Sequence, residues 1–324
     1  MRGNQNMQGA LLALAAMGIY ATHDVVVKYL GSSFSAVQIV FFSALLSFPL
    51  VTIFILQDRT GGSLWPRNPG WVALRTVSAI ITSVCAFYAF GTLPLAQTYA
   101  LLFAIPLIIT ILSIPILGET VRLRRWTAVV VGLVGVLIVL CPGQAALSSG
   151  HLAALIAAFT GALTAIIVRK VGTDERPVVL LIYPILANVL VMGAALPFVY
   201  QPMSTGEFGM MAIIAVMGLI GTVLSILSYR LAEAVIAAPM QYSQIVWAII
   251  YGTLIFDDRP DATTLLGAGI VIASGIYVVL RETKAGASEN HPVIDTSGRG
   301  ETMTTPRPSL LQRILQPGGR SGRG

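Results

Sequence analysis

Long apolar runs separated by short polar segments constrain this chain more than any other feature. Each run holds roughly 20 predominantly apolar residues, the length that a helix needs to cross a bilayer. The runs are continuous, whereas the strands of a membrane barrel alternate in polarity, so the sequence predicts helices. The predicted spans are ten: residues 8–28, 36–56, 71–91, 94–117, 125–141, 150–169, 178–199, 208–230, 234–256 and 262–281.

The composition excludes a soluble enzyme. Only 10% of the 324 residues are charged and 56% are hydrophobic, whereas soluble domains carry roughly 25% charged residues. Cys85 and Cys141 lie in or at the end of apolar runs and indicate no disulfide framework. The basic residues lie at span ends and in the C-terminal segment, which indicates membrane topology and not nucleic-acid binding. We therefore expect an all-α, polytopic membrane protein.

The distribution of positive charge predicts the orientation. Of 20 Lys and Arg residues, 18 fall on one predicted side or in the C-terminal segment, Arg75 among them. Lys28 and Arg259 fall on the other side. Because cytoplasmic segments are enriched in Lys and Arg, we expect both termini in the cytoplasm. Residues 284–324 have the composition of a disordered cytoplasmic tail, with a short membrane-surface helix over 308–315 as the alternative.

A weak internal repeat relates the first half of the chain to the second. Residues 115–119, followed by an apolar run that closes at Leu140, resemble residues 254–258 and the run that closes at Leu280. Each half holds five predicted spans, an odd number, so the second half enters the membrane inverted. Inverted repeats are typical of secondary transporters, whose substrate sites lie near the bilayer midplane. The predicted domains are two five-helix repeats, residues 8–141 and 150–281.

Ten spans in two repeats, with Gly118-Glu119 closing the fourth span, resemble the drug/metabolite transporter superfamily and its EamA repeat over residues 8–281. Residues 23–31 and 238–242 are similar to the bacterial branch that includes S-adenosylmethionine uptake carriers and riboflavin transporters. The second half departs from the pattern, because Asp257-Asp258 stands where the first half has Gly118-Glu119. The resemblance implies a carrier of a small metabolite in the bacterial inner membrane.

Asp24 stands out because it is an ionisable residue within the first predicted span. Tyr20, Asp24 and Lys28 are four residues apart and share one helix face, whereas His23 points about 100° away. In the functional interpretation, Asp24 contacts a polar or cationic substrate or carries a coupling proton, because an ionisable group inside a membrane is costly. In the structural interpretation, Asp24 pairs with Lys28, which reaches toward the interface. The spacing leaves both open.

The predicted fourth and ninth spans carry polar and aromatic groups. A few hydrogen-bonding groups on apolar walls suit an uncharged ligand, and aromatic rings offer stacking surfaces for a flat heterocycle. The alternative is hydrogen bonding between helices. Pro106, Pro115 and Pro239 interrupt these spans and either permit bending or are merely tolerated. The predicted substrate-binding residues are Asp24, Tyr20, Gln97, Tyr99, Gln241, Tyr242, Gln244 and Trp247.

These features favour a secondary transporter that works by alternating access. The sequence has no phosphate-binding loop, no paired catalytic residues and no repeated channel filter, so an intramembrane enzyme or a channel is the weaker alternative. The expected partners are a small metabolite and the lipid bilayer, with a homodimer as one assembly and no nucleic acid, cofactor or metal. Riboflavin uptake is favoured because Lys28 can neutralise Asp24. S-adenosylmethionine or another amino-acid-like metabolite, imported or exported, is the alternative.

Overall fold

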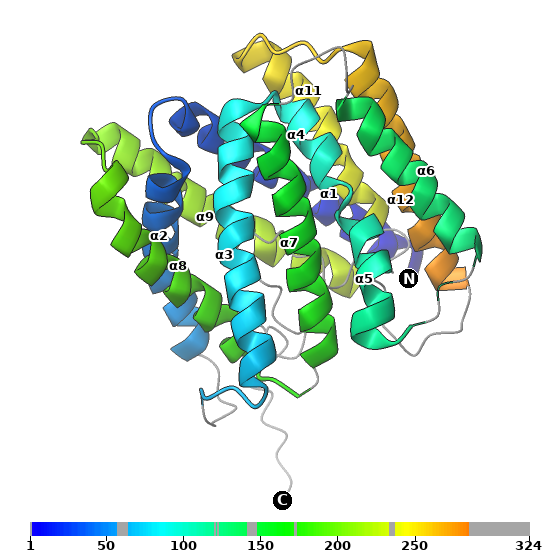
Figure 1. Cartoon of the computed structure of the whole chain (residues 1–324), viewed down its shortest axis with the longest axis horizontal. Coiled ribbons are helices and arrows are strands. Elements are labelled where there is room, and N and C mark those ends of the chain that lie inside the picture. Colours follow the sequence, from blue (N-terminus) through cyan, green and yellow to red (C-terminus); the bar gives the residue numbers. More distant parts are fainter. Residues whose placement is uncertain are drawn as a thin grey trace, which may run out of the picture.

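The computed structural model describes residues 2–56, 64–119, 121, 123–140, 148–171, 174–232 and 237–284. Within these ranges every regular element is a helix (Figure 1). The elements are α1 (Arg2–Gly31), α2 (Ala36–Leu56), α3 (Pro69–Thr92), α4 (Leu95–Leu102), α5 (Ile105–Leu117), α6 (Leu123–Leu140), α7 (Ser149–Val171), α8 (Pro177–Val199), α9 (Thr205–Leu231), η1 (Ala238–Tyr242), α11 (Ser243–Ile255) and α12 (Ala262–Lys284).

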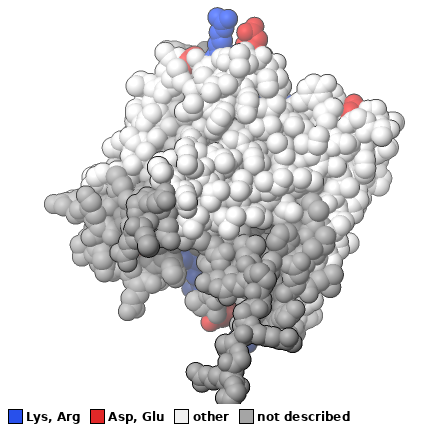
Figure 2. All heavy atoms as spheres, turned by 180° about the vertical axis from the view of Figure 1, so that it is seen from behind, with Lys and Arg blue, Asp and Glu red and all other residues white. Residues whose placement is uncertain are grey.

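The described helices confirm the predicted all-α membrane class. Six helical segments are long and apolar enough to cross a bilayer, and three shorter apolar helices accompany them. Figure 2 shows that the described Lys, Arg, Asp and Glu residues of one face gather at its upper and lower ends, with an uncharged band between them. Such a band fits the hydrocarbon core of a membrane. The predicted tail after Lys284, with its alternative surface helix, lies outside the described residues.

Two of the predicted spans are broken at their prolines. In the fourth span α4 ends at Leu102, and α5 begins at Ile105 with Pro106 in its first turn. In the ninth span the 3₁₀ turn η1, which contains Pro239, leads into α11. Proline lacks a backbone N–H and fits the first turn of a helix, so each proline starts a new segment. Pro115, by contrast, lies inside α5 and does not end it.

The missing glycine of the second half does not change the turn. Gly118 ends α5 with a φ of 72°, and the amide of the following Glu119 donates to the carbonyl of Ser113 at 3.3 Å. Asp257 has a φ of 53°, and the amide of the following residue, Asp258, donates to the carbonyl of Gly252 at 2.8 Å. Both are helix ends with a left-handed residue, a conformation that Asp tolerates better than most side chains.

Equivalent hydrogen bonds relate the two halves. Thr82 on α3 donates to Thr160 on α7 at 2.7 Å between hydroxyl oxygens. The sequence shift that relates the two halves carries Thr82 to Thr222 on α9 and Tyr20 on α1 to Thr160. The equivalent bond is present, because the hydroxyl oxygens of Tyr20 and Thr222 are 2.9 Å apart. The same shift makes a second pair of hydrogen bonds equivalent, because it carries Tyr88 to Ser228 and Gly9 to Ser149. Tyr88 bonds to Ser149, and Ser228 bonds to Gly9. The first helix of each half therefore packs on the other half.

Contacts between the connections show that the halves are inverted. Lys28, near the end of α1, donates to the carbonyl of Leu93 between α3 and α4 and pairs with Asp258 between α11 and α12. We call this the Lys28 end. Arg169, near the end of α7, pairs with Glu119 after α5 at the opposite end, which we call the Glu119 end. Because α1 and α7 are the first helices of their halves and run in opposite directions, the repeat is inverted.

The helices form two bundles with a helix pair on each flank (Figure 1). The α1 bundle contains α1, α9, η1 and α11, and the α7 bundle contains α3, α4, α5 and α7. The pair α2 and α8 lies on one flank and the pair α6 and α12 on the other. In the second pair a Cβ added to Gly267 would lie 2.6 Å from the carbonyl oxygen of Gly135, so only glycine fits at this crossing.

Candidate functional site

Asp24 lies in a buried hydrogen-bond network that joins the two bundles. Its side chain is 0% exposed, and Oδ1 lies 2.7 Å from Nδ1 of His23. The hydroxyl of Tyr99, on α4, donates to Oδ2. The two donors satisfy the buried carboxylate, which would be costly to leave without hydrogen bonds in a low-dielectric interior. His23 is 3% exposed and its ring meets that of Phe87 edge to face. Sequence spacing assigned His23 no part in this network.

Lys28 has other partners than the one that its helix face suggests. The ammonium group pairs with Asp258 at 3.0 Å, donates to the carbonyl of Leu93 at 2.8 Å and lies over the ring of Phe256. The pairing of Lys28 with Asp24 that the sequence allowed is therefore corrected. The long side chain of Lys28 reaches the helix end, where an acidic residue from the second half of the chain takes its charge.

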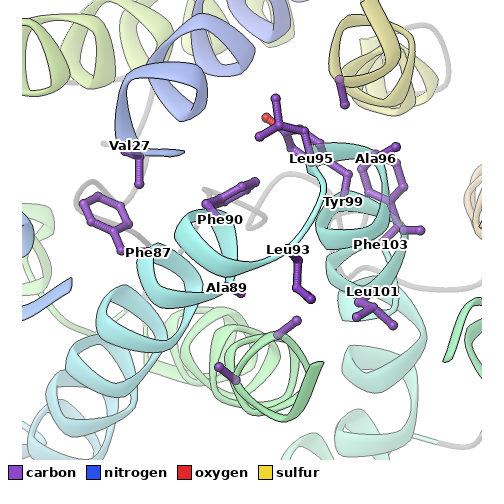
Figure 3. Packing of buried hydrophobic residues seen from close by; sticks show 14 of the residues in the cluster. Val27, Phe87, Ala89, Phe90, Leu93, Leu95, Ala96, Tyr99, Leu101 and Phe103 are labelled. Carbon is purple, nitrogen blue, oxygen red and sulfur yellow. The ribbon is translucent and has the colours of Figure 1, made fainter. Parts of the chain in front are cut away.

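A chain of aromatic rings continues from Tyr99 across the bundle interface. Tyr99 packs against Phe90 with centroids 5.3 Å apart and stacks on Phe103 at 6.1 Å. Phe103 in turn meets Tyr242 of η1 edge to face at 5.0 Å. Figure 3 shows Phe90, Leu93, Tyr99 and Phe103 in one apolar cluster around the turn between α3 and α4. Phe103 was not among the predicted site residues. Its spacing of four residues from Tyr99, which places both rings on one helix face, was the sequence signal that could have identified it.

Tyr20 and Gln241 are used within the α1 bundle. Tyr20 bonds to Thr222 of α9, and its ring covers Gly221, where an added Cβ would lie 2.9 Å from a ring carbon. The side-chain amide of Gln241 donates to the hydroxyl of Tyr229 on α9 at 2.8 Å. These bonds correspond to the interhelical alternative that the sequence left open.

Gln97, Gln244 and Trp247 are not brought to Asp24 by the contacts described. Gln97 is half-buried and lies two positions before Tyr99, which places it on roughly the opposite face of α4. Gln244 is buried at the start of α11. Trp247 stacks on Tyr251 at 5.9 Å and lies against Gly18 in the seam between α1 and α11. Of the predicted residues, Asp24, Tyr99 and Tyr242 therefore lie along one continuous set of contacts.

The polar and close contacts between the bundles gather at the Lys28 end. They include the bonds of Asp24 with Tyr99 and of Lys28 with the Leu93 carbonyl, and a backbone crossing in which a Cβ on Gly31 would lie 2.7 Å from the Cα of Gly91. The polar bonds described at the Glu119 end, such as Arg169 with Glu119, stay inside one bundle. α4 likewise packs on α11, whereas α5 packs mainly on α7.

Arg75 is placed differently from the sequence prediction. The charge distribution counted it among boundary residues, but it lies six residues after Pro69 inside α3 and is 1% exposed. Its Nε and Nη1 atoms have no hydrogen-bond partner among the described residues. The first apolar residues of the span, Trp71 and Val72, precede Arg75, and this was the signal that it enters the membrane with the helix.

No group of three or more His, Cys, Asp or Glu side chains within the described ranges is arranged to hold a metal ion. The described site offers a buried carboxylate, aromatic faces and hydroxyl groups. Such groups bind and release a ligand through hydrogen bonds, charge and stacking.

Comparison with known proteins connects this chain to transport. The family model described as "EamA-like transporter family" matches residues 7–141 and again residues 148–281. A crystal structure with a TM-score of 0.54 and 14% identity covers 89% of this chain and all of its own, and it shows the fold alone.

Three curated relatives have different named substrates. The chain is 26% identical to an "S-adenosylmethionine uptake transporter" of Rickettsia prowazekii, over 86% of this chain and 94% of the relative. It is 27% identical to the "Pseudopaline exporter CntI" of Pseudomonas aeruginosa, over 86% and 97%. It is 28% identical to a "Riboflavin transporter" of Vibrio cholerae, over 88% and 97%. The resemblance drawn from the sequence is confirmed, and the chain is a membrane transporter that belongs to the EamA-like transporter family.

Proposed function

We propose that this chain carries a metabolite with a cationic centre and a flat heterocycle, of the S-adenosylmethionine type, across the membrane. The observation that carries the proposal is the buried Asp24 carboxylate, at a contact between the two bundles, beside the rings of Tyr99 and Phe103. A carboxylate in a low-dielectric interior favours a cation, and aromatic faces attract sulfonium or ammonium groups as well as stacking on adenine.

The position of Lys28 favours one of the two substrates that the sequence left open. Riboflavin was favoured on the expectation that Lys28 neutralises Asp24. Because Asp258 takes the charge of Lys28, that reason is removed. The name of the Rickettsia relative supports a cationic substrate. The name of the Vibrio relative, together with the aromatic chain Phe90–Tyr99–Phe103, keeps riboflavin as the second candidate.

The proposed mechanism is alternating access between the two bundles. Asp24 bonds to Tyr99 across the interface in the described conformation, which is held together at the Lys28 end. A cation that pairs with Asp24 competes with the Tyr99 hydroxyl, so binding loosens this contact. We further propose an inner-membrane location with the Glu119 end in the cytoplasm, supported by the excess of Lys and Arg on that side. The carrier acts without a cofactor or catalytic step.

The test compares Asp24→Asn with Asp257→Asn in proteoliposomes. Liposomes preloaded with S-adenosylmethionine should accelerate uptake of the labelled compound through the wild type, because counterflow requires a carrier. We expect Asp24→Asn to lower this rate by about tenfold or more, since a charge-assisted contact contributes roughly 1.5–3 kcal/mol. Asp257 is exposed and its left-handed backbone suits Asn, so the control variant should retain the wild-type rate.

Two outcomes contradict the proposal. Unchanged S-adenosylmethionine counterflow in Asp24→Asn would exclude cation recognition by this carboxylate. Riboflavin counterflow through the wild type, in the absence of S-adenosylmethionine counterflow, would establish the second candidate instead.

A further inference from the structure

Arg75 has no part in the proposed contacts around Asp24, although it is fully buried. It lies about 9 Å inside the end of α3, given a rise of 1.5 Å per residue over six residues. Arginine keeps its positive charge in proteins, so burial without a partner opposes folding. Nε and Nη1 have no hydrogen-bond partner among the described residues. A charge retained inside a membrane at such a cost indicates a functional role.

The hydroxyl of Thr164 is a second buried group without a partner, and it lies on the surface of α7 that faces α3. It is 4% exposed, and no hydrogen bond to its Oγ1 is described. The bond between Thr82 and Thr160 sets the level of the two antiparallel helices. Arg75 lies two turns from Thr82 and Thr164 one turn from Thr160, both toward the Glu119 end. The backbones of Arg75 and Thr164 therefore lie along the same seam, on the Glu119 side of the Thr82–Thr160 bond, with levels that differ by about one helical turn.

The surroundings of this seam are small or apolar side chains. On α7, Gly161 faces the side chains of Thr82 and Ile105, each 3.5 Å from an added Cβ. Ala162 and Ala165 are buried in the apolar cluster that joins α3, α5 and α7. A few polar groups among apolar walls are the usual composition of a small-molecule site.

We propose that Arg75 and Thr164 form a subsite for the carboxylate of the transported metabolite, separate from Asp24. The guanidinium fork matches the two oxygens of a carboxylate, and the threonine hydroxyl supplies a further donor. One positive charge neutralises one carboxylate, whereas a phosphate dianion would leave an uncompensated charge in the membrane interior. The inference rests on the proposed function, because it assigns the acidic group of the same amino-acid-like substrate.

The repeat gives this subsite a place in transport. The sequence shift that relates Thr82 to Thr222 also carries Asp24 to Thr164, which is its counterpart in the second half. The inversion therefore sets Asp24 toward the Lys28 end and Thr164, with Arg75, toward the Glu119 end. A metabolite that carries both a cation and a carboxylate meets one group of opposite charge in each half of the membrane. The subsite is closed to solvent in the described conformation, so binding requires the α7 bundle to open.

The test measures preference for the carboxylate in the purified full-length chain. Proteoliposomes take up labelled S-adenosylmethionine against competing unlabelled S-adenosylmethionine or its decarboxylated analogue, which keeps the sulfonium and lacks the carboxylate. The wild type should bind the carboxylate compound at least about tenfold more tightly, in line with a charged hydrogen bond. Arg75→Gln should bring this ratio close to one, and Thr164→Val should lower it by about threefold. Arg67→Gln, which changes an exposed arginine just before α3, should keep the wild-type ratio.

Each outcome bears on a separate claim. An unchanged ratio in Arg75→Gln overturns this inference and leaves the Asp24 proposal standing. Failure of the wild type to take up S-adenosylmethionine rejects the proposed function, and this inference with it. If Arg75→Gln does not reach the membrane in folded form, Arg75→Lys and Thr164→Val provide the measurement. Lysine keeps the charge without the fork, so an undiminished ratio in both of these variants also overturns the inference.

Discussion

Asp24 and Lys28 lie one helical turn apart, yet their charges are engaged in different places. The short carboxylate side chain of Asp24 cannot reach water, so Tyr99 and His23 satisfy it inside the protein. The lysine side chain is long enough to reach Asp258 at the end of the bundle. Side-chain length, and not helix face, decides which partner each of the two charges takes.

A residue-scale prediction concerns the glycines of the α6 and α12 pair. A Cβ added to Gly267 would lie 2.6 Å from the carbonyl oxygen of Gly135, whereas nothing lies within 4 Å of one added to Gly269. Gly267→Ala should therefore lower the free energy of unfolding by about 1–3 kcal/mol, the usual cost of overpacking. The loss of monodisperse protein on heating in detergent provides the measurement. A Gly269→Ala variant that loses as much stability would show that the crossing is not the cause.

At the scale of elements, an ion pair fastens the first helix of each half to the other half. Lys28 at the end of α1 pairs with Asp258, which follows α11, and Arg169 at the end of α7 pairs with Glu119, which follows α5. In both pairs the acidic residue comes directly after the left-handed residue that ends its helix. The two clamps lie at opposite ends of the molecule, as an inverted repeat requires.

Charge exchange tests the clamp at the Lys28 end. Lys28→Glu places two acidic groups together and should lower stability by about 3 kcal/mol or more, because one charge of a partly buried pair is left uncompensated. Adding Asp258→Lys should restore part of the loss in thermal unfolding. The exposed pair of Arg259 and Asp257, at 3.8 Å, is the comparison, and Arg259→Ala should change stability by less than about 1 kcal/mol. If the double variant is no more stable than the single one, the pairing is unimportant.

At the scale of the whole molecule, the first helix of each half packs on helices of the other half. Because α1 packs on α9 and α11 and α7 packs on α3 and α5, each bundle draws on both halves of the chain. The bonds inside a bundle occur at both ends, whereas those between the bundles, such as Asp24 with Tyr99, gather at the Lys28 end. In the proposed mechanism, opening that end requires the two bundles to separate, and the helix breaks at Pro106 and Pro239 are the proposed bending points.

Crosslinking across the bundles tests this movement. Val27 on α1 and Phe87 on α3 belong to the same buried cluster and lie side by side in Figure 3. In a chain with Cys85 and Cys141 changed to Ser, Val27→Cys with Phe87→Cys joined by a short bifunctional reagent should abolish most counterflow. Asn68→Cys with Glu175→Cys links two residues that bond within the α7 bundle, and this crosslink should leave counterflow largely intact. Equal inhibition by both crosslinks would contradict movement between the bundles.

The sequence alone determined the membrane class, the ten helical segments and the inverted repeat, and it named Pro106 and Pro239 without deciding whether they break their spans. These features follow from local properties: the length of apolar runs, the positions of proline and the odd number of spans in each half. The Gly118-Glu119 pattern predicted a helix end in the first half, and Asp257 adopts the same conformation without glycine. For the candidate site the sequence singled out Asp24, Tyr99 and Tyr242 as residues, but not their contacts.

The tertiary structure decided which of those residues meet. Tyr99 reaches Asp24 from 75 positions away and Lys28 takes a partner in the other half of the chain, and no periodicity within one helix predicts such pairs. Arg75 shows the same limit, because charge counting assigns an arginine to a membrane boundary while helix packing leaves it 1% exposed within α3. The pattern of apolar residues specifies which residues enter the membrane. The partner of each buried charge depends instead on how the helices pack around that charge.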